Sequence, residues 1–185
     1  MKNNDNEKKD LRVRRTYKLL SDALMTLMKE KPFEKISISD ICDRCQMNRK
    51  SFYYHFKDKY DLVNWIFDIE FSEVMQGVMK KSTIEILKVM NDLLYENREF
   101  YRKALQIYGQ NSFTMHFYDT IFSIISFRFD DIMKLPNGYE FQKRYFTDAI
   151  VVTYRRWLLE DYEMTPNDFL EELRKCVEIM NGRKI

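Results

Sequence analysis

The chain of 185 residues contains only four glycines and three prolines, and 45% of its residues are hydrophobic. So few helix breakers favour long helices over sheets and turns, and the length allows a sizeable core, so we expect an all-α protein. The amino terminus lacks the apolar region of a secretion signal, and no apolar run could span a bilayer, so we do not expect a membrane protein. Three cysteines cannot all pair and suit reduced thiols, so we predict a cytoplasmic location.

Charge is divided unevenly along the chain. Residues 1–60 carry 15 Lys and Arg against 9 Asp and Glu, a net charge of +6, and the rest carry 16 against 20, a net charge of −4. A basic head on an acidic body predicts that the head binds a polyanion, because phosphate neutralisation supplies most non-specific nucleic-acid affinity. A merely solvated basic surface is the alternative. Both interpretations stay open for the basic residues near the start: Lys8, Lys9, Arg12, Arg14 and Arg15.

Four helices are predicted in the first 80 residues. Apolar residues recur at helical spacing over residues 13–28, and Pro32 ends the pattern. The second helix is about two turns long, and the fourth runs to about residue 80. Local start signals mark the second, third and fourth helices: Ser37 with Asp40 as a capping box, Asn48 as an N-cap, and Asp58 with Asp61.

The remaining residues predict further helices, about nine in all. Ser82 and Glu85 open one helix, and the chain breaks at residues 109–111 before an almost wholly apolar helix over residues 113–133. A turn is expected over residues 135–138, followed by a helix over residues 139–160. The last helix opens with a cap, a proline at the first position and an acid: Thr165, Pro166 and Asp168.

Two short helices joined by a tight turn over residues 46–48 are typical of a helix-turn-helix. The second helix would enter the major groove by its amino-terminal end, where Arg49 and Lys50 can reach base edges and Arg suits guanine. Phe52 and Phe56, four residues apart, would anchor this helix to its own domain. The other predicted contacts to bases or phosphates are Ser39, Asn48, Ser51, Tyr53, Tyr54, His55 and Lys59.

The stretch "SFYYHFKDK", residues 51–59, resembles the DNA-binding motif of the TetR family of transcription regulators. Residues 97–105 and 155–166 are similar to the carboxy-terminal regions of one subset of that family. The resemblance implies a three-helix DNA-binding head followed by a helical body that binds an effector and dimerises. It also implies a repressor that leaves a palindromic duplex operator when the effector binds.

Two positions depart from the family pattern. Gln46 stands in the turn where the family often has a glycine suited to a left-handed backbone, and Cys42 stands where it usually has alanine. Cys42 and Cys45 form a C-x-x-C pair, but the only further ligands are Cys176, His55 and His116, at spacings unlike a zinc finger. We therefore expect small helix contacts from these cysteines, with no metal and no cofactor.

An effector site in the body would combine aromatic walls with a few polar groups. His116 illustrates the choice, because in so apolar a helix it is either a core histidine bonded to a neighbour or a polar group of a pocket. The effector is unidentified, with a small molecule favoured. The candidate pocket residues are Trp65, Tyr101, His116, Phe117, Ser123 and Tyr154.

The sequence contains no catalytic motif: it lacks a phosphate-binding glycine loop, HExxH and G-x-S-x-G, so we do not expect an enzyme. We predict a DNA-binding domain over residues 1–56, an effector-binding and dimerisation domain over residues 57–185, and a homodimer through residues 139–180. The competing interpretation is a helical interaction module, or a regulator whose body binds a protein partner instead of a small molecule.

Overall fold

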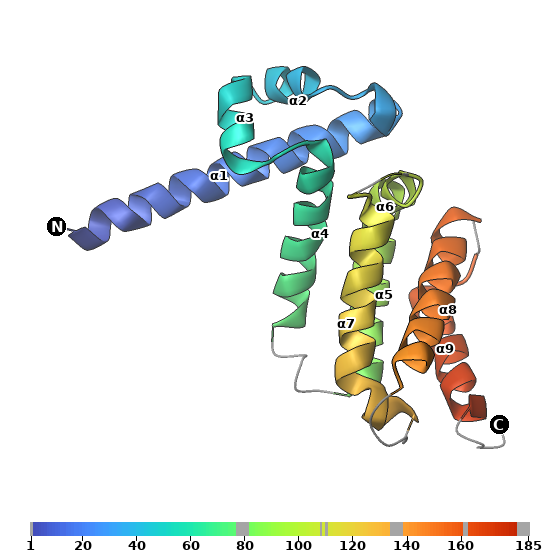
Figure 1. Ribbon diagram of the computed structural model, residues 1–185. Coiled ribbons are helices and arrows are strands. Elements are labelled where there is room, and N and C mark those ends of the chain that lie inside the picture. Colours follow the sequence, from blue (N-terminus) through green and yellow to red (C-terminus); the bar gives the residue numbers. More distant parts are fainter. Residues whose placement is uncertain are drawn as a thin grey trace. The chain divides into compact units, whose positions relative to one another are not determined.

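The computed structural model describes residues 2–76, 82–107, 109, 111–133, 139–160 and 163–180. Over these ranges it contains nine α-helices, one short 3-10 helix and no strand, so the predicted all-α fold is confirmed (Figure 1). No helix in them is both long and apolar enough to cross a membrane. The chain divides into two compact units, Met1–Phe67 and Asp68–Ile185, which we call the head and the body and describe separately.

The head begins with the long helix α1, whose apolar face is buried from Leu20 to Met28. The second half of α1 packs against α2, and its first half extends beyond α2 and α3 (Figure 1). The elements of the head are α1 (Lys2–Glu30), η1 (Phe33–Lys35), α2 (Ile38–Arg44), α3 (Arg49–His55) and the first half of α4 (Lys59–Met75).

The division between the units falls inside α4, eleven residues after the predicted domain boundary at residue 56. The first turns of α4 belong to the head, and their apolar side chains, Leu62, Val63, Ile66 and Phe67, are buried. The helix ends at Met75, and the predicted end near residue 80 lies outside the described residues.

The body packs its helices in two principal pairs, α7 against α8 and α5 against α9. Its centre is aromatic: Phe113 and Phe117 of α7 and Tyr154 of α8 are almost completely buried. The turn expected over residues 135–138 lies outside the described residues. Besides the end of α4, the body contains α5 (Thr83–Glu96), α6 (Arg98–Ala104), α7 (Phe113–Met133), α8 (Glu140–Leu159) and α9 (Pro166–Met180).

The predicted helix starts are confirmed at the level of hydrogen bonds. Ser37 with Asp40, and Ser82 with Glu85, form complete capping boxes at α2 and α5. At α9 the Thr165 hydroxyl accepts a hydrogen bond from the backbone N–H of Asp168 at 3.2 Å. Such caps satisfy backbone N–H groups that have no partner within the helix, which is why these short sequence signals mark helix starts.

Candidate DNA-binding interface

The turn between α2 and α3 sets the position of α3. Gln46 adopts a left-handed backbone with φ of 54°, at the position where the TetR family, which the sequence resembles, often has glycine. The backbone N–H of Met47 then donates to the Cys42 carbonyl at 2.8 Å. Asn48 begins the next helix, with its side-chain oxygen accepting from the Ser51 N–H at 2.8 Å.

The two faces of α3 differ sharply. Phe52 and Phe56 are buried, so the predicted anchors are confirmed. On the outer side Tyr54 is 79% exposed and Tyr53 is 49% exposed, and both are flanked by exposed basic residues. The Arg49 guanidinium lies 5.9 Å from the centre of the Tyr53 ring. The helix therefore presents cationic and phenolic groups together on the face that is not committed to packing.

His55 is placed differently from the neighbouring tyrosines, because it is half-buried and meets the Tyr17 ring of α1 edge-on at 4.9 Å. Burial lowers the pKa of the His55 imidazole below its usual value. At neutral pH the ring is therefore neutral, and it can offer a hydrogen bond to a phosphate but not a full charge.

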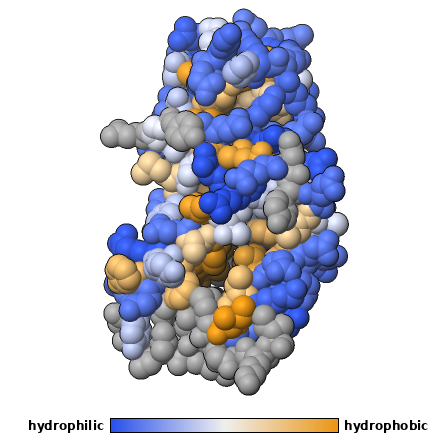
Figure 2. Space-filling view, turned by 90° about the vertical axis from the view of Figure 1, so that its right-hand side faces the viewer, coloured by the Kyte–Doolittle hydropathy of each residue, from blue (hydrophilic) through white to orange (hydrophobic). Residues whose placement is uncertain are grey.

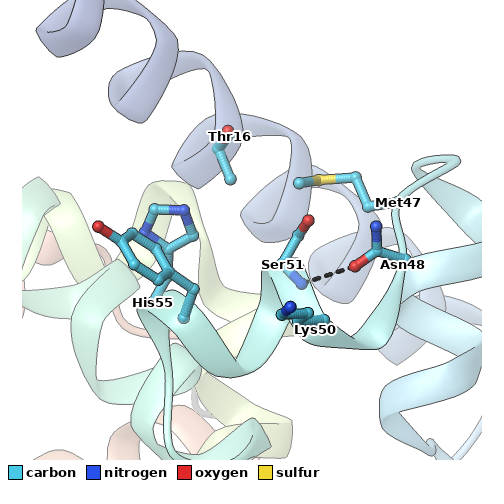
Figure 3. A pocket seen from close by; sticks show the side chains of 7 residues that line it. Thr16, Met47, Asn48, Lys50, Ser51 and His55 are labelled. Carbon is cyan, nitrogen blue, oxygen red and sulfur yellow. Dashed lines mark hydrogen bonds between the residues drawn. The ribbon is translucent and has the colours of Figure 1, made fainter.

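Five of the nine predicted DNA contacts meet in one groove of about 290 Å³ between α1 and α3. Figure 3 shows Thr16 of α1 across the groove from Ser51 of α3. The lining contains hydroxyl, amide, ammonium and imidazole groups and no carboxylate, a composition that suits an anion. The lining residues are Thr16, Met47, Asn48, Lys50, Ser51, Tyr54 and His55.

Thr16 was missed by the sequence analysis. It lies in the apolar repeat of α1, more than thirty residues before the recognition helix, and no local pattern sets it apart. Of the other predicted contacts, Arg49 and Tyr53 lie on the exposed face of α3 outside the groove lining, and Ser39 is half-buried on α2.

Lys59 was predicted to contact a phosphate, and in the structure its ammonium binds backbone carbonyls of the head. Its ammonium donates to the backbone carbonyls of Phe33 at 2.7 Å, Ile36 at 2.8 Å and Glu34 at 3.3 Å. It also lies 4.3 Å from the centre of the Phe33 ring. An ammonium has three N–H donors, so these carbonyls match its capacity and tie α4 to η1.

The six predicted pocket residues have three different kinds of environment in the structure. Trp65 belongs to the head, where it stacks on Tyr17 at 4.6 Å. In the body, Tyr101, Phe117 and Tyr154 are buried core residues. The remaining two are hydrogen-bonded near the surface: His116 bonds to Asp68 at 2.6 Å, and the Ser123 hydroxyl donates to the Asp119 carbonyl at 2.8 Å.

The body has a separate cavity of about 390 Å³ beside α6, and none of the six residues lines it. Its lining combines two arginines and two glutamates with an aromatic pair, in which Tyr95 stacks on Trp157 at a ring distance of 5.8 Å. No local sequence pattern indicates this cavity, because its members come from α5, α6, α8 and the α8–α9 connection. They are Tyr95, Arg98, Glu99, Arg102, Trp157, Leu158 and Glu163.

The C-x-x-C pair occupies the packed side of α2. Cys42 is buried, and the Cys45 thiol donates to the Ile41 carbonyl at 3.2 Å. Burial raises the pKa of both thiols, which disfavours the thiolate that a metal would need. Within the described part of the chain no three His, Cys, Asp or Glu side chains are grouped as metal ligands.

Both units match models of known protein families. Residues 20–66 match the family described as bacterial regulatory proteins, tetR family, and residues 81–178 match a transcriptional regulator C-terminal region. The chain belongs to the TetR family. It is therefore a DNA-binding transcription regulator, and the helix-turn-helix of the head is the element expected to meet DNA.

The chain is also similar to individual proteins and solved structures. The chain is 30% identical over 98 residues to the HTH-type dhaKLM operon transcriptional activator DhaS of Lactococcus lactis, a match spanning about half of each chain (50% and 50%). A solved structure of a dihydroxyacetone kinase operon activator DhaS has a TM-score of 0.64 at 22% identity, covering 90% of this chain and 96% of that chain. A putative TetR-family regulator from Syntrophomonas wolfei has a TM-score of 0.67 at 12% identity, covering 93% and 97%.

Proposed function

We propose that this TetR-family regulator is a cytoplasmic, non-enzymatic repressor that binds a palindromic operator as a homodimer and leaves it when an effector binds the body. Repression needs only operator occupancy, whereas activation needs a further surface for the transcription machinery. The observation that carries operator recognition is the outer face of α3, where Arg49, Lys50 and Tyr53 are exposed beside a groove without carboxylates.

In this proposal the contacts divide into two classes. Arg49 and Lys50, at the start of α3, read base edges in the major groove, where Arg can bind guanine O6 and N7 with two hydrogen bonds. The remaining contacts position the helix on the sugar-phosphate backbone. They are Ser39, Asn48, Ser51, Tyr53, Tyr54 and His55; Lys59 is left out because its ammonium already binds three carbonyls.

The proposed effector site is the cavity beside α6. Its two arginines and two glutamates, next to Tyr95 and Trp157, suit a small polar molecule that carries charge or several hydrogen-bonding groups. A protein partner covering the same surface is the alternative, and its contact would have to extend well beyond the seven residues that line this cavity.

The proposed dimer uses residues 139–180. On α8, Thr147, Val151, Tyr154 and Leu158 are buried within the body, while Phe141 is 77% exposed and Tyr145 is 61% exposed. Figure 2, viewed from the side on which α8 and α9 are drawn in Figure 1, shows apolar patches on this side of the molecule. A second copy related by a two-fold axis would bury such residues and hold two heads at a fixed spacing.

The experiment that tests this function is selection of bound sites from random duplex DNA, followed by binding measurements with Arg49→Lys and Arg49→Ala. The wild type should select a palindrome. Arg49→Lys keeps the charge but loses the planar guanidinium, so base preference should relax while the salt dependence stays unchanged, and Arg49→Ala should change both. Recovery of no preferred sequence would refute operator recognition, and a reporter that rises when the regulator is present would replace repression by activation.

A further inference from the structure

The groove between α1 and α3 differs chemically from the cavity of the body. Six of its seven lining residues, all except Met47, carry a side-chain hydrogen-bond donor, and none carries a carboxylate. The cavity of the body, in contrast, contains Glu99 and Glu163 beside its arginines. A space with one ammonium, several neutral donors and no acid favours an anion over a cation or an apolar group.

One wall of the groove comes from α1, through Thr16. Two other hydroxyls of α1 are engaged by their own helix: Ser21 donates to the Tyr17 carbonyl at 2.8 Å and Thr26 donates to the Asp22 carbonyl at 2.7 Å. Among the described residues the Thr16 hydroxyl has no such hydrogen bond. It is therefore available to a ligand in the groove that it lines.

Arg12 continues this face of α1 toward the amino terminus. It lies four residues before Thr16, so the two side chains share one side of the helix about one turn, or 5.4 Å, apart. Arg12 is exposed, and this part of α1 extends beyond α3 (Figure 1). Lys18 is also exposed, but its position two residues after Thr16 places it on the opposite side of α1.

We propose that α1 is a second DNA-contacting element, which extends the contact with each operator half-site beyond the helix-turn-helix. One backbone phosphate occupies the groove between Thr16 of α1 and Lys50 of α3. Arg12 neutralises a neighbouring phosphate one helical turn further along α1. This inference rests on the proposed operator binding, and it adds two residues of α1 that act on affinity but carry no base preference.

The charge contribution is tested by comparing Arg12→Gln with Lys18→Gln, two variants that each remove one positive charge from an exposed position of α1. Operator affinity is measured from about 50 to about 200 mM salt. A dimer of Arg12→Gln loses two phosphate contacts, one per subunit. Between these two salt concentrations its affinity should therefore fall about tenfold less than the affinity of the wild type. Lys18→Gln should behave like the wild type, and both variants should select the wild-type operator.

The groove is tested separately with Thr16→Val, which keeps the shape of the side chain but removes the hydroxyl, and with Thr16→Ser, which restores it. Phosphate-ethylation interference on the selected operator should show one position per half-site that weakens wild-type binding but no longer affects Thr16→Val, and Thr16→Ser should recover it. Equal salt dependence for Arg12→Gln and Lys18→Gln, with an unchanged interference pattern, would overturn the role of α1 while operator recognition by α3 stands. A wild type without a preferred operator would overturn both.

Discussion

Lys59 illustrates how one side chain can hold together the connections of a binding domain. The carbonyls it binds belong to Phe33, Glu34 and Ile36, which form the short connection between α1 and α2. Burial lowers the pKa of the Lys59 ammonium, while the nearby charges of Glu34 and Asp40 act in the opposite direction. Because α4 follows α3 directly, this lysine fixes both the connection before α2 and the helix after α3.

Replacement of Lys59 by Met should therefore destabilise the head and leave the phosphate contacts intact. The methionine retains the apolar stem but leaves the carbonyls without their charged donor, which should cost about 2 kcal/mol of unfolding free energy. Thermal unfolding followed by circular dichroism measures this loss, and the salt dependence of operator binding should remain that of the wild type. A salt slope reduced by about two for a dimer, at unchanged stability, would show instead that Lys59 binds phosphate.

The second half of α4, which belongs to the body, contacts the neighbouring helices α6 and α7 through polar side chains. Asp68 binds His116 of α7 at 2.6 Å, and Glu70 accepts hydrogen bonds from the Tyr101 hydroxyl of α6 and, at 3.3 Å, from the Asn97 amide. Burial raises the pKa of Glu70 above its usual value, and the hydrogen bonds from Tyr101 and Asn97 only partly oppose this. Since α4 also belongs to the head, these contacts join the helix shared by both units to α6, which lines the cavity of the body.

The raised pKa of Glu70 makes the stability of the body depend on pH. The folded state holds the proton more tightly than the unfolded state, so the stabilisation is complete below the unfolded pKa of 4.5 and is lost as pH rises through the folded pKa. Glu70→Gln keeps an acceptor for Tyr101 and removes the buried charge. Urea unfolding across this pH range should show a smaller decline of stability for Glu70→Gln than for the wild type.

The exposed Glu73, one turn later on α4, provides the matched control for this measurement. Glu73→Gln removes the same charge from a solvated position. Because the Glu73 charge adds to the effect of burial in raising the pKa of Glu70, the stability of Glu73→Gln should follow a pH dependence between those of the wild type and Glu70→Gln, closer to the wild type. If Glu70→Gln and Glu73→Gln gave the same curve, the carboxyl of Glu70 would not be responsible for the pH dependence.

At the scale of the whole molecule, the exposed aromatic residues of α8 are the feature that a single copy of the chain leaves uncovered. Phe141 and Tyr145 lie four residues apart on one side of the helix, Val152 continues that side, and Ile179 is exposed near the end of α9. Other apolar residues of α8 are covered by the body itself, because Trp157 is buried and Ile150 and Leu159 are half-buried.

Replacement of Phe141 and Tyr145 by Glu should give a folded monomer, because both side chains are exposed and contribute little to the core. Loss of the second head should reduce operator affinity roughly a hundredfold or more, since the two half-sites no longer bind as one unit. Sedimentation measures the assembly and circular dichroism the helical content. Met115→Glu, at an exposed apolar position of α7, is the control and should remain dimeric.

A wild type that sediments as a monomer at micromolar concentration and still binds its operator would contradict this interface. The same measurement separates dimerisation from effector binding, the two roles proposed for the body, because the charged replacements on α8 do not alter the residues that line the cavity beside α6.

The sequence by itself determined most of the helices, several of their caps and the DNA-binding motif, but not the separation of α5 from α6 or the start of α1 at Lys2. These features depend on interactions between residues a few positions apart, such as the bond of Asn48 to the Ser51 N–H or the buried pair Phe52 and Phe56 on one turn of helix. Gln46 stood out in the sequence as a departure from a family pattern, and the structure then showed its left-handed backbone. Local signals of this kind can be recognised in the sequence without knowledge of the tertiary fold.

Only the tertiary structure decided which side chains meet across the chain. Thr16 and Lys50 line one groove although 34 positions separate them, Lys59 turns to the carbonyls of η1, and Trp65 packs in the head instead of a pocket in the body. The cavity beside α6 likewise collects residues from distant helices. Side-chain periodicity states which face of a helix is apolar, but the element that covers that face depends on how the whole chain packs.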